Sequence, residues 1–197
     1  MGAVEGQSQP GVEPFAAPLQ ALNGLIEALG GRGVIVGGVA ASLLGAPRFT
    51  ADLDAVVLLQ VEEIPRLMRV AAQHGLQARI PDAEEFARQY RMVLLRHAAS
   101  GVDVDVALGM LPFEEEMIAR SQEVAVGGLR LRLPTPEDLV VMKAVAHRPK
   151  DLTDIRTVVA RYPHLDRRRV EYWVRQFADA LDQPQLWEEI APLINAD

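Results

Sequence analysis

The chain has 197 residues, of which 49% are hydrophobic, so it can form one large domain or a core domain with a small helical one. Its formal net charge of −7 and its isoelectric point near 5.2 argue against tight nonspecific binding to nucleic acid, although a local basic patch can still hold RNA. The absence of cysteine excludes disulfides, zinc–thiolate sites and catalysis by a thiol.

The first 18 residues show little hydrophobic periodicity and contain three prolines, so we expect a flexible tail over residues 1–18. This segment has no basic region followed by an apolar core, and no apolar run in the chain reaches the length of about 18 residues that spans a bilayer. We therefore expect no signal peptide, no transmembrane helix and a cytoplasmic location.

Helices and strands then alternate along the chain. Apolar residues at helical spacing predict a helix over residues 19–29, and β-branched runs predict strands over residues 34–36 and 54–59, with a short helix over residues 39–44 between them. Further strands are expected at 76–80, 91–97 and 102–108, further helices at 62–74 and 113–120, a helical turn or loop at 82–89, and a hairpin at 123–133.

The last third of the chain is predicted to be helical. Thr135 is the expected N-cap of a helix that carries Leu139, Met142 and Ala146 on one face. Three more helices are expected between residues 151 and 194. Strands alternating with helices, followed by helices alone, predict an α/β (α+β) fold in which a small mixed β-sheet is flanked by helices.

We expect the domain organisation to follow that division. The flexible tail over residues 1–18 precedes a sheet-containing core over residues 19–133, and a helical C-terminal lobe occupies residues 134–197.

A glycine pair, Gly37-Gly38, separates the first strand from the short helix. The ordinary role of such a pair is a tight turn. The alternative role is a close approach of the backbone to a phosphate, with amide donors at the start of the following helix. The pair is neither a dinucleotide fingerprint nor a Walker loop, because the third glycine and the Gly-Lys-Ser/Thr sequence are missing.

Asp52 and Asp54 stand at the mouth of the second strand, although aspartate is a poor strand former. Residues two apart on a strand point to the same side, about 6.6 Å apart along the chain, so the two carboxylates repel each other. A divalent cation removes that conflict, and carboxylate oxygens favour magnesium or manganese. The alternative is a pair of surface aspartates with no ligand.

Asp103 and Asp105 repeat the pattern, alternating with valines on a strand that we expect to be central. They place two more carboxylates on one face of the sheet. One or both can belong to a solvated face, and one can be a third metal ligand on a neighbouring strand. Asp105 is favoured over Asp103, because it directly precedes the apolar end of the strand.

The glycine pair, the Asp-x-Asp pair and a third aspartate on a later strand together resemble the DNA polymerase β nucleotidyltransferase superfamily. Within it, the segments RFTADLD (48–54), PEDLVVMK (136–143) and RPKDLTD (148–154) resemble the bacterial abortive-infection nucleotidyltransferases, which include toxins of toxin–antitoxin pairs. The resemblance covers about residues 34–156 and implies a nucleotidyltransferase core with a helical C-terminal lobe.

The resemblance also implies a site. Asp52, Asp54 and Asp105 would hold Mg²⁺ or Mn²⁺, two ions in all, with Asp103 as the alternative to Asp105. The residues implied to bind the nucleoside triphosphate are Gly37, Gly38, Ser42, Arg48, Thr50, Lys143, Lys150 and Asp154.

Two of these groups have simpler explanations. Lys143 can be a solvated helix lysine rather than a contact to the triphosphate. Lys150 and Asp154 are four residues apart and can pair on a helix, and Asp151 with Asp154 can cap one.

The activity implied by the resemblance is transfer of a nucleoside monophosphate to an acceptor hydroxyl on tRNA, a protein or a small molecule, in a protein that acts as a toxin with an antitoxin partner. The run Arg167-Arg168-Arg169 is the best local candidate for an RNA contact, and otherwise a solvated helix face. The alternative function is a catalytically inactive relative that serves as a binding or regulatory protein, which the three occupied carboxylate positions argue against. A calcium-binding domain is disfavoured, because no loop has EF-hand spacing.

Overall fold

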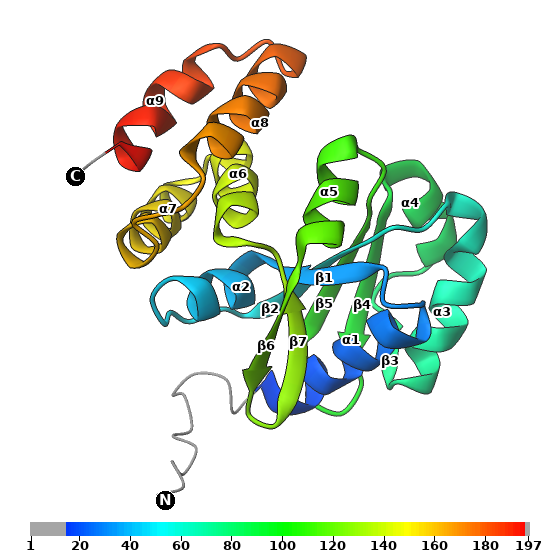
Figure 1. Ribbon diagram of the computed structural model, residues 1–197. Coiled ribbons are helices and arrows are strands. Elements are labelled where there is room, and N and C mark those ends of the chain that lie inside the picture. The colour runs from blue at the N-terminus through cyan, green and yellow to red at the C-terminus, as the bar shows by residue number, and fades with distance from the viewer. Residues whose placement is uncertain (1–14, 196–197) are drawn as a thin grey trace, which may run out of the picture. The chain divides into compact units, whose positions relative to one another are not determined.

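The computed structural model describes residues 15–195 of the chain (Figure 1). Within these residues the chain divides into two compact units, one formed by residues 15–39 and 48–133 and the other by residues 40–47 and 134–195. Most of the predicted tail lies outside the described residues, but helix α1 (Ala16–Ala28) begins three residues earlier than we predicted. None of the helices described has both the length and the apolar character needed to cross a bilayer.

The first unit is built on a mixed β-sheet, which confirms the predicted fold class. In the part of the chain that the structure describes, the sheet has the order β1-β2-β5-β4-β3. The strands are β1 (Gly33–Val36), β2 (Asp52–Val57), β3 (Leu76–Ala78), β4 (Met92–His97) and β5 (Asp103–Leu108). Strands β2 and β5 are parallel, whereas the other neighbouring pairs are antiparallel.

One face of this sheet forms the core of the unit. Leu53, Val104 and Val106 are fully buried, and they alternate along β2 and β5 with side chains that are partly exposed. Helix α1 packs against β1, β2 and helix α3 (Ile64–Gln73). The remaining elements of the unit are the 3₁₀ turn Val61–Glu63, α4 (Ala83–Tyr90), α5 (Pro112–Arg120), and the hairpin of β6 (Gln122–Val126) and β7 (Leu129–Leu133).

Two elements near the motif residues differ from the prediction. Strand β2 begins at Asp52 rather than Asp54, because Asp52 already pairs with Asp103 in the parallel ladder. Helix α2 (Gly37–Leu44) begins directly after β1, so the glycine pair forms its first turn. Both differences bring the predicted site residues into regular structure.

The second unit is helical: the helices predicted after residue 134 are present, and residues 40–44 of α2 also belong to this unit. Helix α6 (Pro136–Ala146) packs against α7 (Pro149–Arg161), α8 (Arg167–Ala180) and α9 (Gln185–Ile194). The predicted N-cap is confirmed, since Thr135 Oγ1 accepts a hydrogen bond of 3.3 Å from the Asp138 backbone N–H. Of the residues that we placed on one face of this helix, Leu139 is buried and Ala146 is exposed, and the helix also buries Lys143.

Candidate active site

Four aspartates lie side by side on one face of the sheet in the first unit. The parallel ladder sets Asp52 opposite Asp103 and Asp54 opposite Asp105. The residues between them are buried on the other face, so all four carboxylates share the face that is only partly covered. Adjacent strands are about 4.8 Å apart, which brings the two aspartate pairs close enough to interact strongly.

The glycine pair approaches this face closely. Val36 pairs with Asp54 across β1 and β2, and Gly37 follows with a φ of 63°, a conformation that a residue with a side chain rarely adopts. A Cβ atom at Gly37 would overlap the Asp54 carboxylate, and one at Gly38 would overlap the Thr50 hydroxyl. The two glycines therefore allow the backbone at the start of α2 to lie directly against Asp54 and Thr50, in addition to turning the chain.

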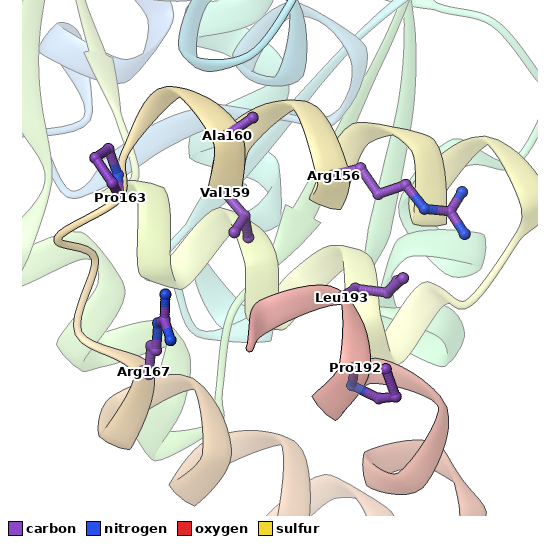
Figure 2. Close-up of a pocket in the computed structure, with 7 residues that line it drawn as sticks. All are labelled: Arg156, Val159, Ala160, Pro163, Arg167, Pro192 and Leu193. Atoms are coloured by element: carbon purple, nitrogen blue, oxygen red, sulfur yellow. The ribbon is translucent and has the colours of Figure 1, made fainter. Parts of the chain in front are cut away.

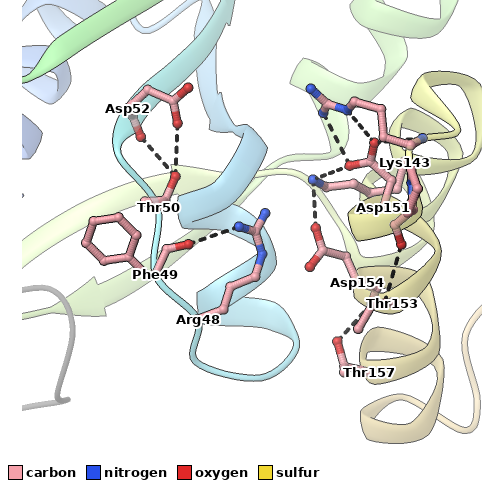
Figure 3. A network of polar contacts seen from close by, with 11 residues as sticks. Arg48, Phe49, Thr50, Asp52, Lys143, Asp151, Thr153, Asp154 and Thr157 are labelled. Carbon is pink, nitrogen blue, oxygen red and sulfur yellow. Dashed lines mark hydrogen bonds and ion pairs between the residues drawn. The ribbon is translucent and has the colours of Figure 1, made fainter.

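The loop before β2 is held by its own side chains (Figure 3). Thr50 Oγ1 donates to the Asp52 carboxylate at 3.0 Å, and Arg48 Nη1 donates to the Phe49 carbonyl oxygen at 3.2 Å. The Phe49 side chain itself is 85% exposed. Arg48 and Thr50 thus flank Asp52, as the sequence predicted, and the role of Thr50 here is to orient Asp52.

Two arginines that the sequence analysis missed contact the carboxylates of β5. Arg79, just after β3, forms ion pairs with both Asp103 and Asp105, the latter at 2.8 Å. Arg96 on β4 lies opposite Asp103 and pairs with it at 2.7 Å. No spacing in the sequence connects either arginine with the aspartates, because the contacts depend on the order of the strands in the sheet.

These contacts separate the acidities of the two aspartates. The hydrogen bond from Arg96 lowers the pKa of Asp103 against the effect of burial, and Arg79 lowers it further. The pKa of Asp105 is instead raised, chiefly by burial, because the nearby Arg79 does not offset burial together with the charges of Asp103 and Asp52. Asp105 is therefore the carboxyl group that would gain more from an additional cation.

The donor chemistry of this face suits a divalent metal, although its side chains are not arranged as a closed site. Between residues 15 and 195 no three carboxylate or imidazole groups converge on one point in a way that would hold a metal ion. Asp52, Asp54 and Asp105 nevertheless present carboxylate oxygens on one face, and the Asp54 carboxylate packs directly against the Cα of Gly37. These residues fit Mg²⁺ or Mn²⁺ by ligand type.

The second unit contains the other predicted nucleotide-binding residues in a different setting (Figure 3). Lys143 is 4% exposed, and its Nζ lies 3.0 Å from Asp151 and 2.9 Å from Asp154. Arg148 also contacts Asp151, through Nε at 2.6 Å and through its backbone N–H at 3.1 Å. The lysine is thus neither solvated nor exposed, and Asp151 caps the first turn of α7.

The positions of Lys150 and Ser42 indicate no role in a site. Lys150 is exposed on α7, and Asp154 pairs with Lys143 rather than with Lys150, contrary to the simple helix pair that the spacing allowed. Ser42 is half-buried on α2 and belongs, with the two lysines, to the second unit. The structure thus brings together the glycines, Arg48, Thr50 and the four aspartates in one unit, and Lys143 with Asp154 in the other.

The second unit also has a cleft of its own, about 610 Å³ in volume. Figure 2 shows Arg156 and Arg167 at its opposite ends, with aliphatic side chains between them. Its lining consists of Arg156, Val159, Ala160, Pro163, Arg167, Pro192 and Leu193. Arg167 belongs to the basic run that we considered for RNA, whereas Arg169 of the same run pairs with buried Asp138 at 2.7 Å and has a structural role.

Comparisons with known proteins give a consistent result. Residues 19–174 match a family model described as "Nucleotidyltransferase of unknown function (DUF6036)". No curated protein sequence matches the chain.

Three solved structures share the fold. An antigenic nucleotidyltransferase-like protein from Paracoccidioides brasiliensis has a TM-score of 0.52 at 16% identity, over 93% of this chain and 92% of that one. The antibiotic-resistance factor ANT(2'')-Ia has a TM-score of 0.53 at 15% identity, over 84% and 93%. A candidate nucleotidyltransferase from H. pylori has a TM-score of 0.53 at 14% identity, over 97% and 85%.

Proposed function

Because the chain belongs to the DUF6036 family of nucleotidyltransferases, we propose that it uses divalent metal ions to move a nucleoside monophosphate from a nucleoside triphosphate to an acceptor hydroxyl. The observation that carries this proposal is the register of β2 and β5, which sets Asp54 beside Asp105 and Asp52 beside Asp103 on one partly open face. Four carboxylates on one face attract further positive charge even though two arginines contact the β5 pair, and cation-assisted phosphoryl chemistry uses such a cluster.

In this proposal Asp52, Asp54 and Asp105 hold two Mg²⁺ or Mn²⁺ ions. Bound there, the ions supply positive charge for the triphosphate and lower the pKa of the acceptor hydroxyl. Thr50 fixes the orientation of Asp52 through its 3.0 Å hydrogen bond. Asp105 is favoured over Asp103 as the third ligand, because Asp103 is already neutralised by two guanidinium groups.

The glycine pair has a defined part in this site. The missing side chain at Gly37 makes room for the Asp54 carboxylate itself, and the backbone amides of Gly37 and Gly38 begin helix α2. Amide groups at a helix start favour anions, so the triphosphate is the expected ligand there. Arg48, from the loop before β2, adds a guanidinium group on the same unit.

The helical lobe has a separate role in the proposal. The motif resemblance implies that Lys143 and Asp154, with Lys150 and Ser42, also contact the nucleotide; all four belong to the second unit. Because Lys143 is buried between two carboxylates, its contribution to binding would require it to exchange those partners for phosphate oxygens. The stability of Lys143→Met tests the structural role of these two ion pairs.

The acceptor class decides the biological role, and the toxin-like motifs favour RNA or protein over a small molecule. A toxin of this kind would be neutralised by an antitoxin partner in the cytoplasm. The acidic composition limits RNA binding to local basic groups such as Arg156, Arg167 and Arg168, all in the second unit.

A labelling experiment tests the reaction and the acceptor together. The protein is incubated with Mg²⁺ and each of the four nucleoside triphosphates, labelled either on the α- or on the γ-phosphorus. The acceptors are total tRNA, cell protein, or hydroxyl-bearing small molecules such as antibiotics. We expect transfer of the α-label to one acceptor class and none of the γ-label, with loss of transfer in Asp52→Asn/Asp54→Asn. Transfer of the γ-label would contradict nucleotidyl transfer, because it marks a kinase.

A further inference from the structure

Arg79 occupies an unusual position relative to the carboxylate face. It follows β3, the edge strand, and its backbone N–H donates to the Leu94 carbonyl oxygen at 2.9 Å. Leu94 is in turn the cross-strand partner of Asp105. The side chain of Arg79 therefore spans from the edge strand over β4 to β5, where it meets the aspartate that lies beside Asp54.

Both ends of the Arg79 guanidinium are engaged. Nη2 donates to Asp105 Oδ1 at 2.8 Å, and Nη1 pairs with Asp103. The side chain is 21% exposed, and the two aspartates are 31% and 27% exposed, so the ion pairs are partly shielded from water. Partly buried guanidinium–carboxylate bonds are stronger than surface ones, because they are less screened.

Arg96 provides an internal comparison. It lies on the neighbouring strand, its one ion pair in the described part of the chain is with Asp103, and its side chain is 53% exposed. Both arginines therefore place a positive charge beside Asp103, but within residues 15–195 only Arg79 of the two contacts Asp105. The two residues separate a general charge effect from a specific effect on Asp105.

We propose that Arg79 is a resident counter-cation of Asp105, which a divalent metal ion must displace, so that Arg79 sets the metal affinity of the site. The inference rests on the proposed function, because it assumes that Asp105 is a metal ligand. Arg79 Nη2 already neutralises Asp105 through Oδ1, and a divalent ion bound to the same carboxylate would lie close to the guanidinium charge and be repelled by it, so the two cations compete for Asp105. Arg79 is accordingly a positioning residue, since it acts through Asp105.

The test is Mn²⁺ binding, measured by calorimetry on the full-length protein with and without a nonhydrolysable nucleoside triphosphate. Removal of the competing charge in Arg79→Gln is expected to tighten Mn²⁺ binding about tenfold, equivalent to ~1.4 kcal/mol. Arg96→Gln is expected to change the Kd by less than about threefold, because exposed ion pairs contribute little. Equal effects of the two substitutions, or no tightening in Arg79→Gln, would overturn the inference.

Repeating the measurement in an Asp103→Asn variant shows through which aspartate Arg79 affects Mn²⁺ binding. In Asp103→Asn, the effect of Arg79→Gln on Mn²⁺ binding is expected to persist, because Asp105 remains. Its disappearance would show that Arg79 acts through Asp103 and would refute the proposal. Absence of Mn²⁺ binding in every variant, with nucleotide present, would instead refute the metal site itself, whereas equal binding in wild type and Arg79→Gln refutes only the role of Arg79.

A measurement on the unaltered chain covers the case in which Arg79→Gln does not fold. Side-chain ¹⁵N NMR of the arginine Nη groups is recorded during titration with diamagnetic Mg²⁺. The Arg79 signal is expected to change from slow to fast exchange as Asp105 is released, while the Arg96 signal keeps its exchange rate. An Arg79 signal that is unchanged at saturating Mg²⁺ would overturn the displacement.

Discussion

The burial of Lys143 leads to a prediction about stability. Its ammonium group is the shared partner of Asp151 and Asp154, whose side chains are 0% and 5% exposed. Lys143→Met keeps most of the side-chain volume but leaves both carboxylates without that charge. Breaking a buried ion pair from one side costs about 3–5 kcal/mol, and since Arg148 still neutralises Asp151, we expect about 3 kcal/mol.

That value is measurable in this chain. At about 2–4 °C per kcal/mol for a chain of this length, Lys143→Met should lower the Tm by about 6–12 °C. Urea unfolding followed by tryptophan fluorescence reports on the helical unit, because Trp173 on α8 and Trp187 on α9 are the two tryptophans of the chain. The midpoint should fall while the slope with urea stays constant.

The matched control is Lys150→Met, which removes an exposed lysine from the neighbouring helix. Its effect on the free energy of unfolding is expected to stay within about 0.5 kcal/mol. If Lys143→Met proved as stable as this control, the ammonium would not be neutralising the buried carboxylates. The structural role assigned to Lys143 would then be refuted.

Three further predictions concern the carboxylates and the glycine pair. Gly37→Ala should abolish metal-dependent triphosphate binding in calorimetry, because the added Cβ displaces the Asp54 carboxylate. Gly31→Ala is the control, since Gly31 has a similar φ of 68° but open space around it; this variant should lose only ~1 kcal/mol of stability and bind the triphosphate normally. Asp105→Asn should weaken Mn²⁺ binding more than about tenfold and Asp103→Asn less than about threefold; the reverse order in calorimetric titration would make Asp103 the third ligand. Burial raises the pKa of Asp151, but hydrogen bonds from its cationic neighbours outweigh burial and hold that pKa below its ordinary value, so the contribution of Asp151 to stability is complete above the unfolded pKa and is lost as the pH falls through the folded pKa. Asp151→Asn should therefore reduce the fall of the urea midpoint with decreasing pH below about pH 4. An unchanged fall of the midpoint in this variant would contradict the prediction.

The sequence predicted the elements well where local patterns determine them. Alternation in Val-Asp-Val-Asp-Val predicts both β5 and the common face of Asp103 and Asp105, and this pattern is independent of the neighbouring strands. Thr135 followed by Pro136 likewise predicts the start of α6. Such features depend on residues that are close in sequence.

Contacts between distant strands could not be predicted in this way. The pairing of Asp54 with Asp105 depends on a parallel ladder between strands far apart in the sequence, and the contacts of Arg79 depend on β3 being the edge strand. The burial of Lys143 likewise results from three helices packing around α6, which its weak hydrophobic periodicity does not reveal. These tertiary arrangements determine the electrostatics of both clusters.

The central proposal is that the carboxylate face binds a metal–nucleotide complex. It is tested most directly by calorimetric titration of the four nucleoside triphosphates with and without Mg²⁺, on the intact protein and on Asp52→Asn/Asp54→Asn. We predict that at least one triphosphate binds only when Mg²⁺ is present, and that the double substitution abolishes this binding. Triphosphate binding that is the same without metal, or that persists in the double variant, would contradict the proposed site.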